Sequence, residues 1–320
     1  MKYSVIVPVY NRPDEVDELL ESLSSQTLRD FEVVIVEDGS QIPCKDVCDK
    51  YANILDLHYY FKENSGPGQS RNYGVERANG EYVIIVDSDA VTPPGFIQAV
   101  DDELKRQPSD AWGGPDAAHE SFTDIQKAIS YAMTSFFTTG GIRGGKKQLD
   151  KFYPRSFNLG VRREVYQALG GFSPLRFSKM SLYGEDIDFS IRIYKGGYSC
   201  RLFPEAWLWH KRRTDFRRFW RQVYNSGIAR VNLWRKYPEA LKPVHALPSV
   251  FTIGVAGLLL LAPFTRGLSL LPLLLYILLI FIDSSIRNRS VKVGLISIPA
   301  VFVQLIGYGT GFIESLFRKV

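Results

Sequence analysis

The chain has 320 residues, a net charge of +5 and a hydrophobic fraction of 45%. This length suits one large domain or two modest ones. Its three cysteines, Cys44, Cys48 and Cys200, suit a reducing compartment, and a zinc site is not expected because no histidine or second cysteine pair lies near the first two.

The first predicted elements are a strand and a helix. Residues 3–8 form a continuous apolar run rich in β-branched residues, which is typical of a strand buried on both faces. Pro13 suits a helix start, and apolar residues then recur at helical spacing, at Val16, Leu19, Leu20 and Leu23. This pattern predicts an amphipathic helix laid on a sheet.

Strands and helices continue to alternate as far as residue 87. The pattern predicts strands over 31–40, 57–61 and 81–87, and a helix over 67–79. That order implies an α/β fold with a doubly wound, mostly parallel sheet and helices on both faces. In such a sheet the ligand lies at the carboxyl ends of the strands.

Polar clusters follow three of the predicted strands and should face one crevice. They are Pro8 with Tyr10 and Asn11, Glu37 with Asp38, and Asp87 with Asp89. Two carboxylates at one strand end repel each other unless a cation or a ligand's donors compensate. Mg²⁺ or Mn²⁺, held by carboxylates and substrate phosphates, is the simplest solution. Taken alone, Asp-Ser-Asp is a weak signal, since short acid pairs mostly lie on solvated turns.

Five segments together resemble a known family. They are SVIVPVYNRPDEVDELLESLSSQT (4–27), VVIVEDGS (33–40), GPGQSRNYGVERANGEYVIIVDSDA (66–90), FNLGVRREVYQALGGFS (157–173) and YGEDIDFSIRIYKGGY (183–198). In this order they resemble the family 2 glycosyltransferases with the GT-A fold. The resemblance implies an enzyme that takes a sugar from a nucleotide donor, with Mn²⁺ or Mg²⁺ as cofactor.

The resemblance assigns the first two polar clusters to the donor nucleotide. Pro8 and Tyr10, with Asn11 beside them, match the segment that lines the nucleotide pocket. Asp38, preceded by Glu37, matches the acid that recognises the base or ribose. The preferred nucleotide is UDP, because most similar enzymes use it.

The resemblance also assigns the diphosphate end of the donor. Arg71 matches a basic residue beside the nucleotide, although a surface helix charge is the plain alternative. Asp87 and Asp89 match the DxD element, in which the second acid holds the divalent ion and the first contacts ribose or the ion's waters. His210 matches a position near the metal and diphosphate, against the alternative of a structural histidine.

For the acceptor side, Asp186 matches the general base that takes the proton from the acceptor hydroxyl, with inversion at the sugar carbon. Glu185 is expected to position the loop or the acceptor, and the alternative for both acids is to complement a helix dipole. Gly170, Gly171 and Phe172 match the loop that shapes the acceptor pocket. The QxxRW element of processive synthases is missing from FWRQVYNSGIARVNLW, which favours a single sugar transfer.

Three apolar runs follow Pro243, at about 244–262, 267–282 and 293–313. A membrane-spanning helix needs about 20 apolar residues, so the runs predict about three transmembrane helices rather than buried core helices. The basic and aromatic stretch over 201–242 predicts contact with anionic lipid headgroups, and nucleic-acid binding is the weaker reading. Gly307 and Gly311 form a GxxxG that could pack helices or support self-association. The oligomeric state is left open.

The predicted organisation is a GT-A domain over 1–240, with a nucleotide half (1–115) and an acceptor half (116–240), followed by a membrane domain over 241–320. The N-terminal residues do not have the pattern of a signal peptide. The loop after the second apolar run is basic, which favours a cytoplasmic loop. The catalytic domain is therefore expected on the cytoplasmic side. The expected acceptor is a hydroxyl of a lipid-linked or cell-envelope glycan, with polyprenyl phosphate as alternative. A haloacid-dehalogenase-type phosphatase, suggested by DSDAV, leaves the first 80 residues unexplained.

Overall fold

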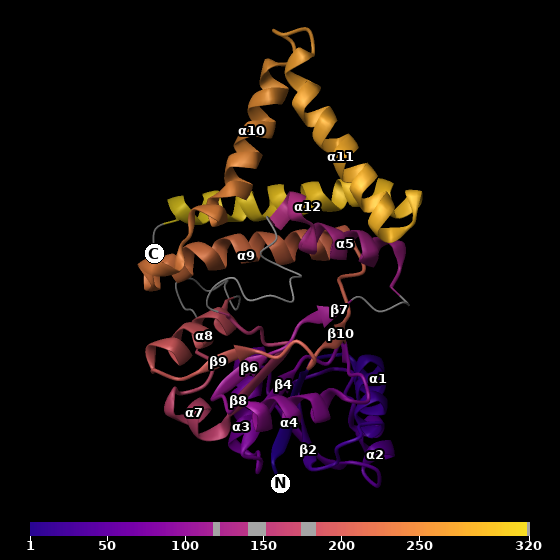
Figure 1. Ribbon diagram of the computed structural model, residues 1–320, viewed down its shortest axis with the longest axis vertical. Coiled ribbons are helices and arrows are strands. Elements are labelled where there is room, and N and C mark those ends of the chain that lie inside the picture. Colours follow the sequence, from indigo (N-terminus) through magenta and orange to yellow (C-terminus); the bar gives the residue numbers. More distant parts are fainter. Residues whose placement is uncertain (118–121, 140–151, 174–183, 319–320) are drawn as a thin grey trace. The chain divides into compact units, whose positions relative to one another are not determined.

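The computed structural model describes residues 1–117, 122–139, 152–173 and 184–318 (Figure 1). The chain divides into two compact units. The first contains Met1–His119, Lys146–Pro174 and Glu185–His210, and the second contains Glu120–Gly145, Leu175–Gly184 and Lys211–Val320. This division differs from the boundary expected near residue 240, because the basic and aromatic helix after His210 packs with the C-terminal apolar helices.

The first unit is built on a seven-stranded sheet in the order β3-β2-β1-β4-β8-β6-β9. The strands are β1 (Tyr3–Val9), β2 (Phe31–Asp38), β3 (Asp56–Lys62), β4 (Tyr82–Val86), β6 (Ala111–Gly113), β8 (Asn158–Arg162) and β9 (Cys200–Leu202). Strands β3, β2, β1 and β4 run parallel, whereas β8 is antiparallel to both its neighbours. The predicted α/β class with a mostly parallel sheet is thus confirmed, with β8 as the strand that makes the sheet mixed.

Helices cover both faces of this sheet because successive strand residues point to opposite sides. On one face, Val5 and Val7 pack with α1 (Pro13–Ser24), α2 (Lys45–Tyr51) and α4 (Phe96–Arg106). On the other, Ile6 packs with α3 (Pro67–Glu76), α7 (Arg163–Ala168) and α8 (Glu185–Lys195). The four apolar residues that predicted the first helix are all buried in α1.

A second, three-stranded sheet joins segments that lie far apart in sequence. It consists of β5 (Ala90–Val91), β10 (Leu208–His210) and β7 (Asp116–Ala117) in the order β5-β10-β7. In its register His210 lies opposite Ala90 and Trp209 opposite Val91. The pairing therefore brings His210 next to the residue that follows Asp89.

The second unit is helical. Its helices are α5 (Asp124–Thr134), α6 (Phe136–Thr139), α9 (Phe216–Lys236), α10 (Leu247–Leu261), α11 (Leu271–Asn288) and α12 (Val291–Phe317), with short 3-10 turns η1 (Pro238–Ala240), η2 (Pro243–Ala246) and η3 (Leu268–Leu270). Among the described residues, three helical stretches are long and apolar enough to cross a membrane: Pro243–Leu261, Leu268–Asn288 and Val291–Phe317. They coincide with the three predicted apolar runs.

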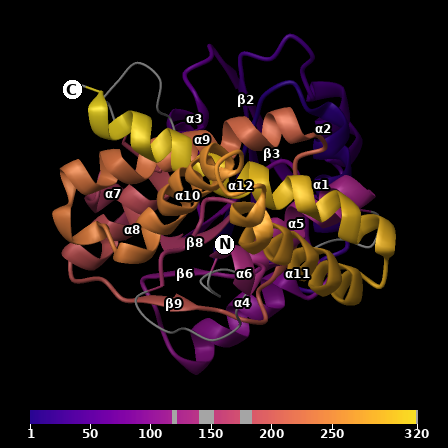
Figure 2. The ribbon, with the colours of Figure 1, turned by 90° about the horizontal axis from the view of Figure 1, so that it is seen from above.

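The three long helices of this unit do not run side by side. In Figure 1, α10 and α11 rise from α12 as a hairpin, and α12 runs across the feet of that hairpin beside α9. Seen from above, α12 again extends along its full length across the unit (Figure 2). The orientation of α12 thus differs from that of the two hairpin helices.

The GxxxG of α12 packs within the chain. A Cβ atom on Gly307 would approach Val223 Cγ2 to 2.7 Å, and one on Gly311 would collide with the backbone of Tyr224. On α9, Gly227 lies equally close to the backbone of Tyr308. The small-residue face of α12 is therefore covered by α9. This motif is not free to support the self-association considered from the sequence.

Candidate active site

The acids of the Asp-Ser-Asp motif lie directly after β4, beside β10 of the small sheet. His210 Nε2 is 3.0 Å from Asp89 Oδ1 and 3.9 Å from Asp87 Oδ2. One ligand atom from each of the three residues fits within a mutual distance of 4.8 Å. The structure therefore brings together all three residues predicted for metal binding.

The donor set fits a divalent cation. Two carboxylates and one imidazole suit Mn²⁺, and carboxylates with substrate phosphates suit Mg²⁺. Asp89 is nearly buried, with 7% of its side chain exposed, whereas Asp87 keeps 28% and faces solvent in part. Ring stacking of Phe157 on His210, at 4.8 Å between centroids, holds the imidazole in place.

Two arginines balance the charge of the paired acids. Arg71 Nη2 donates to Asp87 Oδ1 at 2.8 Å, and Arg12 Nη1 donates to Asp89 Oδ2 at 2.8 Å. Buried like charges need such partners. Arg12 also binds Glu15, which fixes its side chain at the start of α1. Sequence reasoning missed Arg12, because only its place after Asn11 marked it and its partner is 77 residues away.

Asn11 shapes the turn after β1. Its φ is +54°, a left-handed conformation that asparagine tolerates better than most residues. Its side-chain oxygen accepts hydrogen bonds from the backbone of Gln41 (2.8 Å) and Ile42 (3.0 Å), so it ties this turn to the loop after β2. Beside it, Tyr10 is half exposed and Pro8 lies within β1. Tyr10 is the most exposed of these three residues, and Pro8 and Asn11 are partly exposed.

Glu37 and Asp38 lie at the end of β2 and are both buried. Glu37 is fully inaccessible and accepts hydrogen bonds from Ser40 and from the backbone of Cys44, at 2.7 Å for the latter. Such contacts support the loop after β2. Direct contact of Glu37 with a nucleotide stays a prediction that this geometry does not favour.

The environment of Asp38 stabilises its ionised carboxylate. Burial by itself would raise its pKa, but the bond from Lys62 and the backbone N–H of Ser65 lower the pKa below its ordinary value. The N–H of Gly66 adds a bond of 2.9 Å to the other oxygen. Because Gly66 precedes α3, Asp38 fixes the start of the helix that carries Arg71. Lys62 is a second residue that sequence reasoning missed.

Arg71 connects the donor-side acids to the loop at 170–172. It is buried, and its guanidinium lies 5.3 Å from the ring of Phe172. Its neighbour Asn72, also missed from sequence, binds Phe172 through both backbone groups at 2.8 Å and accepts from Tyr166 at 2.7 Å. Phe172 itself is 2% exposed in the core. Its side chain therefore does not line a surface, and its part in an acceptor pocket stays a prediction.

The two glycines of this loop differ in what surrounds them. Both have positive φ, +71° at Gly170 and +59° at Gly171. A Cβ on Gly170 would meet nothing within 4 Å, whereas one on Gly171 would collide with the Asn72 side-chain oxygen. The loop is further anchored by Arg192, which donates to the carbonyls of Leu169 and Gly171 at 2.6 Å each.

We expect Gly170→Ala to cost about 1 kcal/mol, the strain of a left-handed alanine. Gly171→Ala should cost about 1–3 kcal/mol more, because it also displaces the Asn72 amide from its buried partners. Thermal unfolding of the two variants beside the parent protein measures the difference. Equal losses of stability would show that the Asn72 contacts do not hold this loop.

Glu185 and Asp186 open α8 and differ in environment. Glu185 is 5% exposed, and its carboxylate lies against Gly68 in the first turn of α3, where any larger side chain would strike it. Burial raises its pKa from 4.5 to about 7, and the charges of Asp186 and Asp188 act in the same direction. Asp186 is more open, with 18% of its side chain exposed and Arg155 Nη1 at 3.3 Å from Oδ2. Of the two acids, Asp186 is the one accessible to a reactant.

The raised pKa of Glu185 predicts a pH-dependent loss of stability. Below pH 4.5 the carboxyl is protonated in both states, and between pH 4.5 and 7 the unfolded chain ionises first, so the free energy of unfolding falls. Above pH 7 the deficit is constant at about 3 kcal/mol. Glu185→Gln should therefore be more stable than the parent at pH 8 but not at pH 4.5, by denaturation at both pH values. The exposed Glu164→Gln is the control, and a gain that did not change with pH would contradict the buried-acid explanation.

The acid pair at the carboxyl end of β4 and the antiparallel strand β8 beside it agree with the GT-A fold that the resemblance implies. The profile of glycosyl transferase family 2 matches residues 4–170, more than half of the 320 residues. The chain belongs to glycosyl transferase family 2. The family prediction made from five segments is confirmed.

Curated relatives agree with this assignment. An uncharacterized glycosyltransferase of Rickettsia felis is 29% identical over 137 residues, which cover 43% of this chain and 22% of that protein. The poly(ribitol-phosphate) β-N-acetylglucosaminyltransferase TarS of Staphylococcus aureus is 44% identical over 93 residues, covering 28% of this chain and 16% of TarS. The chain thus spans less than a quarter of the length of these curated relatives.

The fold is shared over nearly the whole chain with two solved structures. The mannosyltransferase PcManGT of Pyrobaculum calidifontis, in complex with GDP-Man and Mn²⁺, has a TM-score of 0.65 and 18% identity, covering 99% of this chain and 87% of that one. A fragment of Staphylococcus aureus TarS in complex with UDP-GlcNAc has a TM-score of 0.52 and 20% identity, covering 98% and 91%. At these identities the likeness concerns the fold alone.

Proposed function

We propose that the protein is an inverting, divalent-metal-dependent glycosyltransferase that moves a sugar from a nucleoside diphosphate donor to a hydroxyl of a lipid-linked or cell-envelope glycan. The observation that carries this proposal is the convergence of Asp87, Asp89 and His210 within 4.8 Å at the carboxyl end of β4. A metal–diphosphate site is the arrangement that needs two acids and an imidazole at this edge.

The donor side of the proposal uses the residues around β1, β2 and α3. Tyr10 offers an exposed ring for the base. Asp38 is ionised at the end of β2 but only 4% exposed, so it would act on the nucleotide mainly through Lys62 and the start of α3, which it holds. TarS in complex with UDP-GlcNAc supports a uridine nucleotide, whereas PcManGT with GDP-Man is the alternative among proteins of the same fold. UDP remains the preferred nucleotide.

The cation would be held by Asp89 and Asp87, with His210 as third ligand. When bound, Mn²⁺ or Mg²⁺ supplies Lewis-acid stabilisation of the charge on the departing diphosphate. Arg71, which is buried beside Asp87, adds a positive charge that does not depend on the ion.

The acceptor side uses the first turn of α8. Asp186 accepts the proton of the acceptor hydroxyl as the oxygen attacks the sugar opposite the leaving diphosphate, which inverts the anomeric centre. Arg155 orients the Asp186 carboxylate through the contact at 3.3 Å. Glu185, buried against α3, positions this turn and does not act as the base. The loop with Gly170 and Gly171 is tied to α8 through Arg192.

An acceptor of different chemistry is the second candidate. Polyprenyl phosphate is already an anion and would not need Asp186 as a base, and the apolar helices of the second unit favour a lipid acceptor of either kind. Retention of normal turnover by an Asp186 variant would favour the phosphate acceptor. The phosphatase alternative requires an aspartyl-phosphate at Asp87, which a transferase does not form.

We further propose that the C-terminal helices attach the enzyme to the membrane, with the catalytic unit on the cytoplasmic side. Three helical stretches have the required length and hydropathy, and six cations of α9 suit anionic headgroups. The proposed partners are the nucleotide-sugar donor, the glycan acceptor and membrane lipids, with no nucleic acid.

Thermal stabilisation of the detergent-solubilised protein by nucleotides tests the donor site. UDP, GDP, dTDP and CMP are compared, each with and without Mn²⁺. A ligand that binds only the folded state raises its apparent stability, by about 2.7 kcal/mol at 100 times Kd. We expect stabilisation by UDP that requires Mn²⁺. If neither free nucleotides nor intact nucleotide sugars stabilise the protein, the metal–diphosphate assignment is wrong.

A further inference from the structure

Helix α12 has the length and hydropathy of a membrane span but not its surroundings. Within its most apolar stretch, 39% of the residues are buried in the structure, against 6% for Pro243–Leu261 and 11% for Leu268–Asn288. The hairpin helices α10 and α11 expose large apolar side chains along their length, for example Ile253, Leu260 and Leu275. Much of the apolar surface of α12 is thus already covered by protein.

The largest part of the cover comes from α9, which runs parallel to the C-terminal half of α12, and α5, α10 and α11 also pack on α12. Gly307 packs on Val223, Gly311 packs on Tyr224, and further along Arg235 Nη2 donates to the carbonyl of Ser315 at 2.7 Å. Both helices advance in the same direction through these contacts. Consequently the two helices share one depth relative to any membrane.

That depth is set by the charges of α9. The helix carries six cations and no acid: Arg217, Arg218, Arg221, Arg230, Arg235 and Lys236. Charged side chains at the centre of a bilayer are costly, and a helix with six of them along 21 residues suits the headgroup region instead. Exposed Trp220 and Trp234 on the same helix are side chains of the kind enriched at that level. A crossing α12 would draw these cations into the hydrocarbon.

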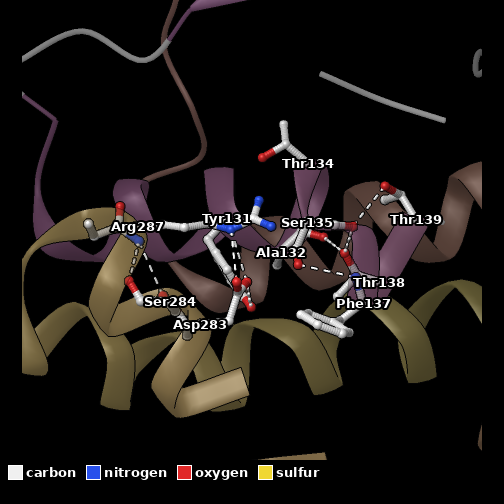
Figure 3. A network of polar contacts seen from close by, with 12 residues as sticks. Tyr131, Ala132, Thr134, Ser135, Phe137, Thr138, Thr139, Asp283, Ser284 and Arg287 are labelled. Carbon is white, nitrogen blue, oxygen red and sulfur yellow. Dashed lines mark hydrogen bonds and ion pairs between the residues drawn. The ribbon is translucent and has the colours of Figure 1, made fainter. Parts of the chain in front are cut away.

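Polar contacts also surround the other end of α12 and the foot of α11. Lys292 pairs with Asp124 of α5 at 2.8 Å. Figure 3 shows Asp283, near the end of α11, accepting from Tyr131 of α5 at 2.7 Å and from Arg287 at 3.0 Å. These ion pairs and hydrogen bonds place the foot of the hairpin in a polar layer together with α5 and the start of α12.

We infer that only α10 and α11 cross the membrane, as a hairpin, and that α12 lies along the cytoplasmic headgroup layer beside α9. The inference rests on the proposed membrane attachment and revises the predicted number of spans from three to two. At 1.5 Å per residue the stretches of 19 and 21 residues are about 28 and 31 Å long, which matches a hydrocarbon core of about 30 Å. Arg266 and Gly267 then form the tip on the far side. The partner is a lipid surface with anionic headgroups.

The membrane topology of the full chain in cells decides between two and three membrane-spanning helices. A short epitope is placed before Met1, between Arg266 and Gly267, or after Val320, and its access to an antibody is compared in spheroplasts and in permeabilised cells. A two-span chain hides the first and third epitopes until permeabilisation and exposes only the epitope at the tip. A three-span chain exposes the epitope after Val320 as well, which would overturn the inference. An epitope at the tip that is also hidden would overturn it too, because the hairpin then does not cross.

Two controls separate this inference from the proposed function. Each tagged chain must keep the Mn²⁺-dependent stabilisation by nucleotide, which reports the catalytic unit and not the topology. Extraction of the chain from membranes by alkaline carbonate would overturn membrane attachment itself, and with it the two-span arrangement, while leaving the donor site unaffected.

Discussion

Asp186→Asn is expected to lower kcat by about 10³-fold, within the range of roughly 10²–10⁴ that general-base catalysis contributes. The substitution keeps the size of the side chain and its place in the first turn of α8, but it removes the carboxylate that would accept the acceptor proton. Stabilisation by the donor nucleotide should stay unchanged, because the Asp87, Asp89 and His210 cluster is not altered. Initial rates at saturating donor and acceptor, together with nucleotide-induced thermal shifts, measure both effects.

Asp46→Asn is a matched control for this experiment. Asp46 also lies in the first turn of a helix, α2, and is exposed. It reports what loss of a dipole-complementing charge does by itself, which is a fraction of a kcal/mol in stability. A rate loss shared by both variants would remove the case for Asp186 as base. A normal rate for Asp186→Asn alone would favour polyprenyl phosphate as the acceptor.

The fold was predictable where the sequence pattern reflects burial on both faces of a sheet. The strands β1, β2 and β4 are continuous apolar runs, and the helix α1 shows a clear helical period, so each was found within a few residues. The chain order of these elements then implies a parallel sheet. Strands β6, β8 and β9 are short, and β8 is antiparallel to both its neighbours. No local sequence pattern indicates how these strands pair.

The candidate site was predictable only in part, because some of its residues meet through strand pairings and contacts between distant segments. Asp87 and Asp89 follow a strand and are visible as a motif, but His210 joins them through a register between β5 and β10 that spans 120 residues. Arg12 and Asn72 act on partners 77 and 100 residues away. Composition likewise cannot separate α12 from α10 and α11, because the difference lies in what packs against each helix.

The second large effect is expected for Asp89→Asn, which should abolish the Mn²⁺-dependent part of nucleotide stabilisation and lower activity by about 10²-fold or more. The estimate follows from the several kcal/mol that a metal ion contributes to charge stabilisation. Asp89 is the more buried acid of the pair and faces both His210 and Arg12, so its loss removes the central ligand of the proposed site. Folding should survive, because Arg12 keeps its bond to Glu15. Thermal shifts with UDP across a range of Mn²⁺ concentrations measure the effect.

A second carboxylate and histidine cluster provides the control, because Mn²⁺ could in principle act there. Ligand atoms of Glu32, Asp56 and His58 also lie within 4.8 Å of one another. These residues are near the starts of β2 and β3, at the edge of the sheet away from Asp87 and Asp89. Glu32 has no exposed surface and is engaged by Ser4 at 2.5 Å and by the backbone of Asn79 at 2.6 Å. The cluster also lies away from the carboxyl ends of the strands, where ligands of such sheets bind. Asp56→Asn should therefore keep the full Mn²⁺ effect. If Asp56→Asn loses the Mn²⁺-dependent stabilisation while Asp89→Asn retains it, the ion binds at the end of the sheet away from the proposed donor site. The proposed metal site would then be wrong.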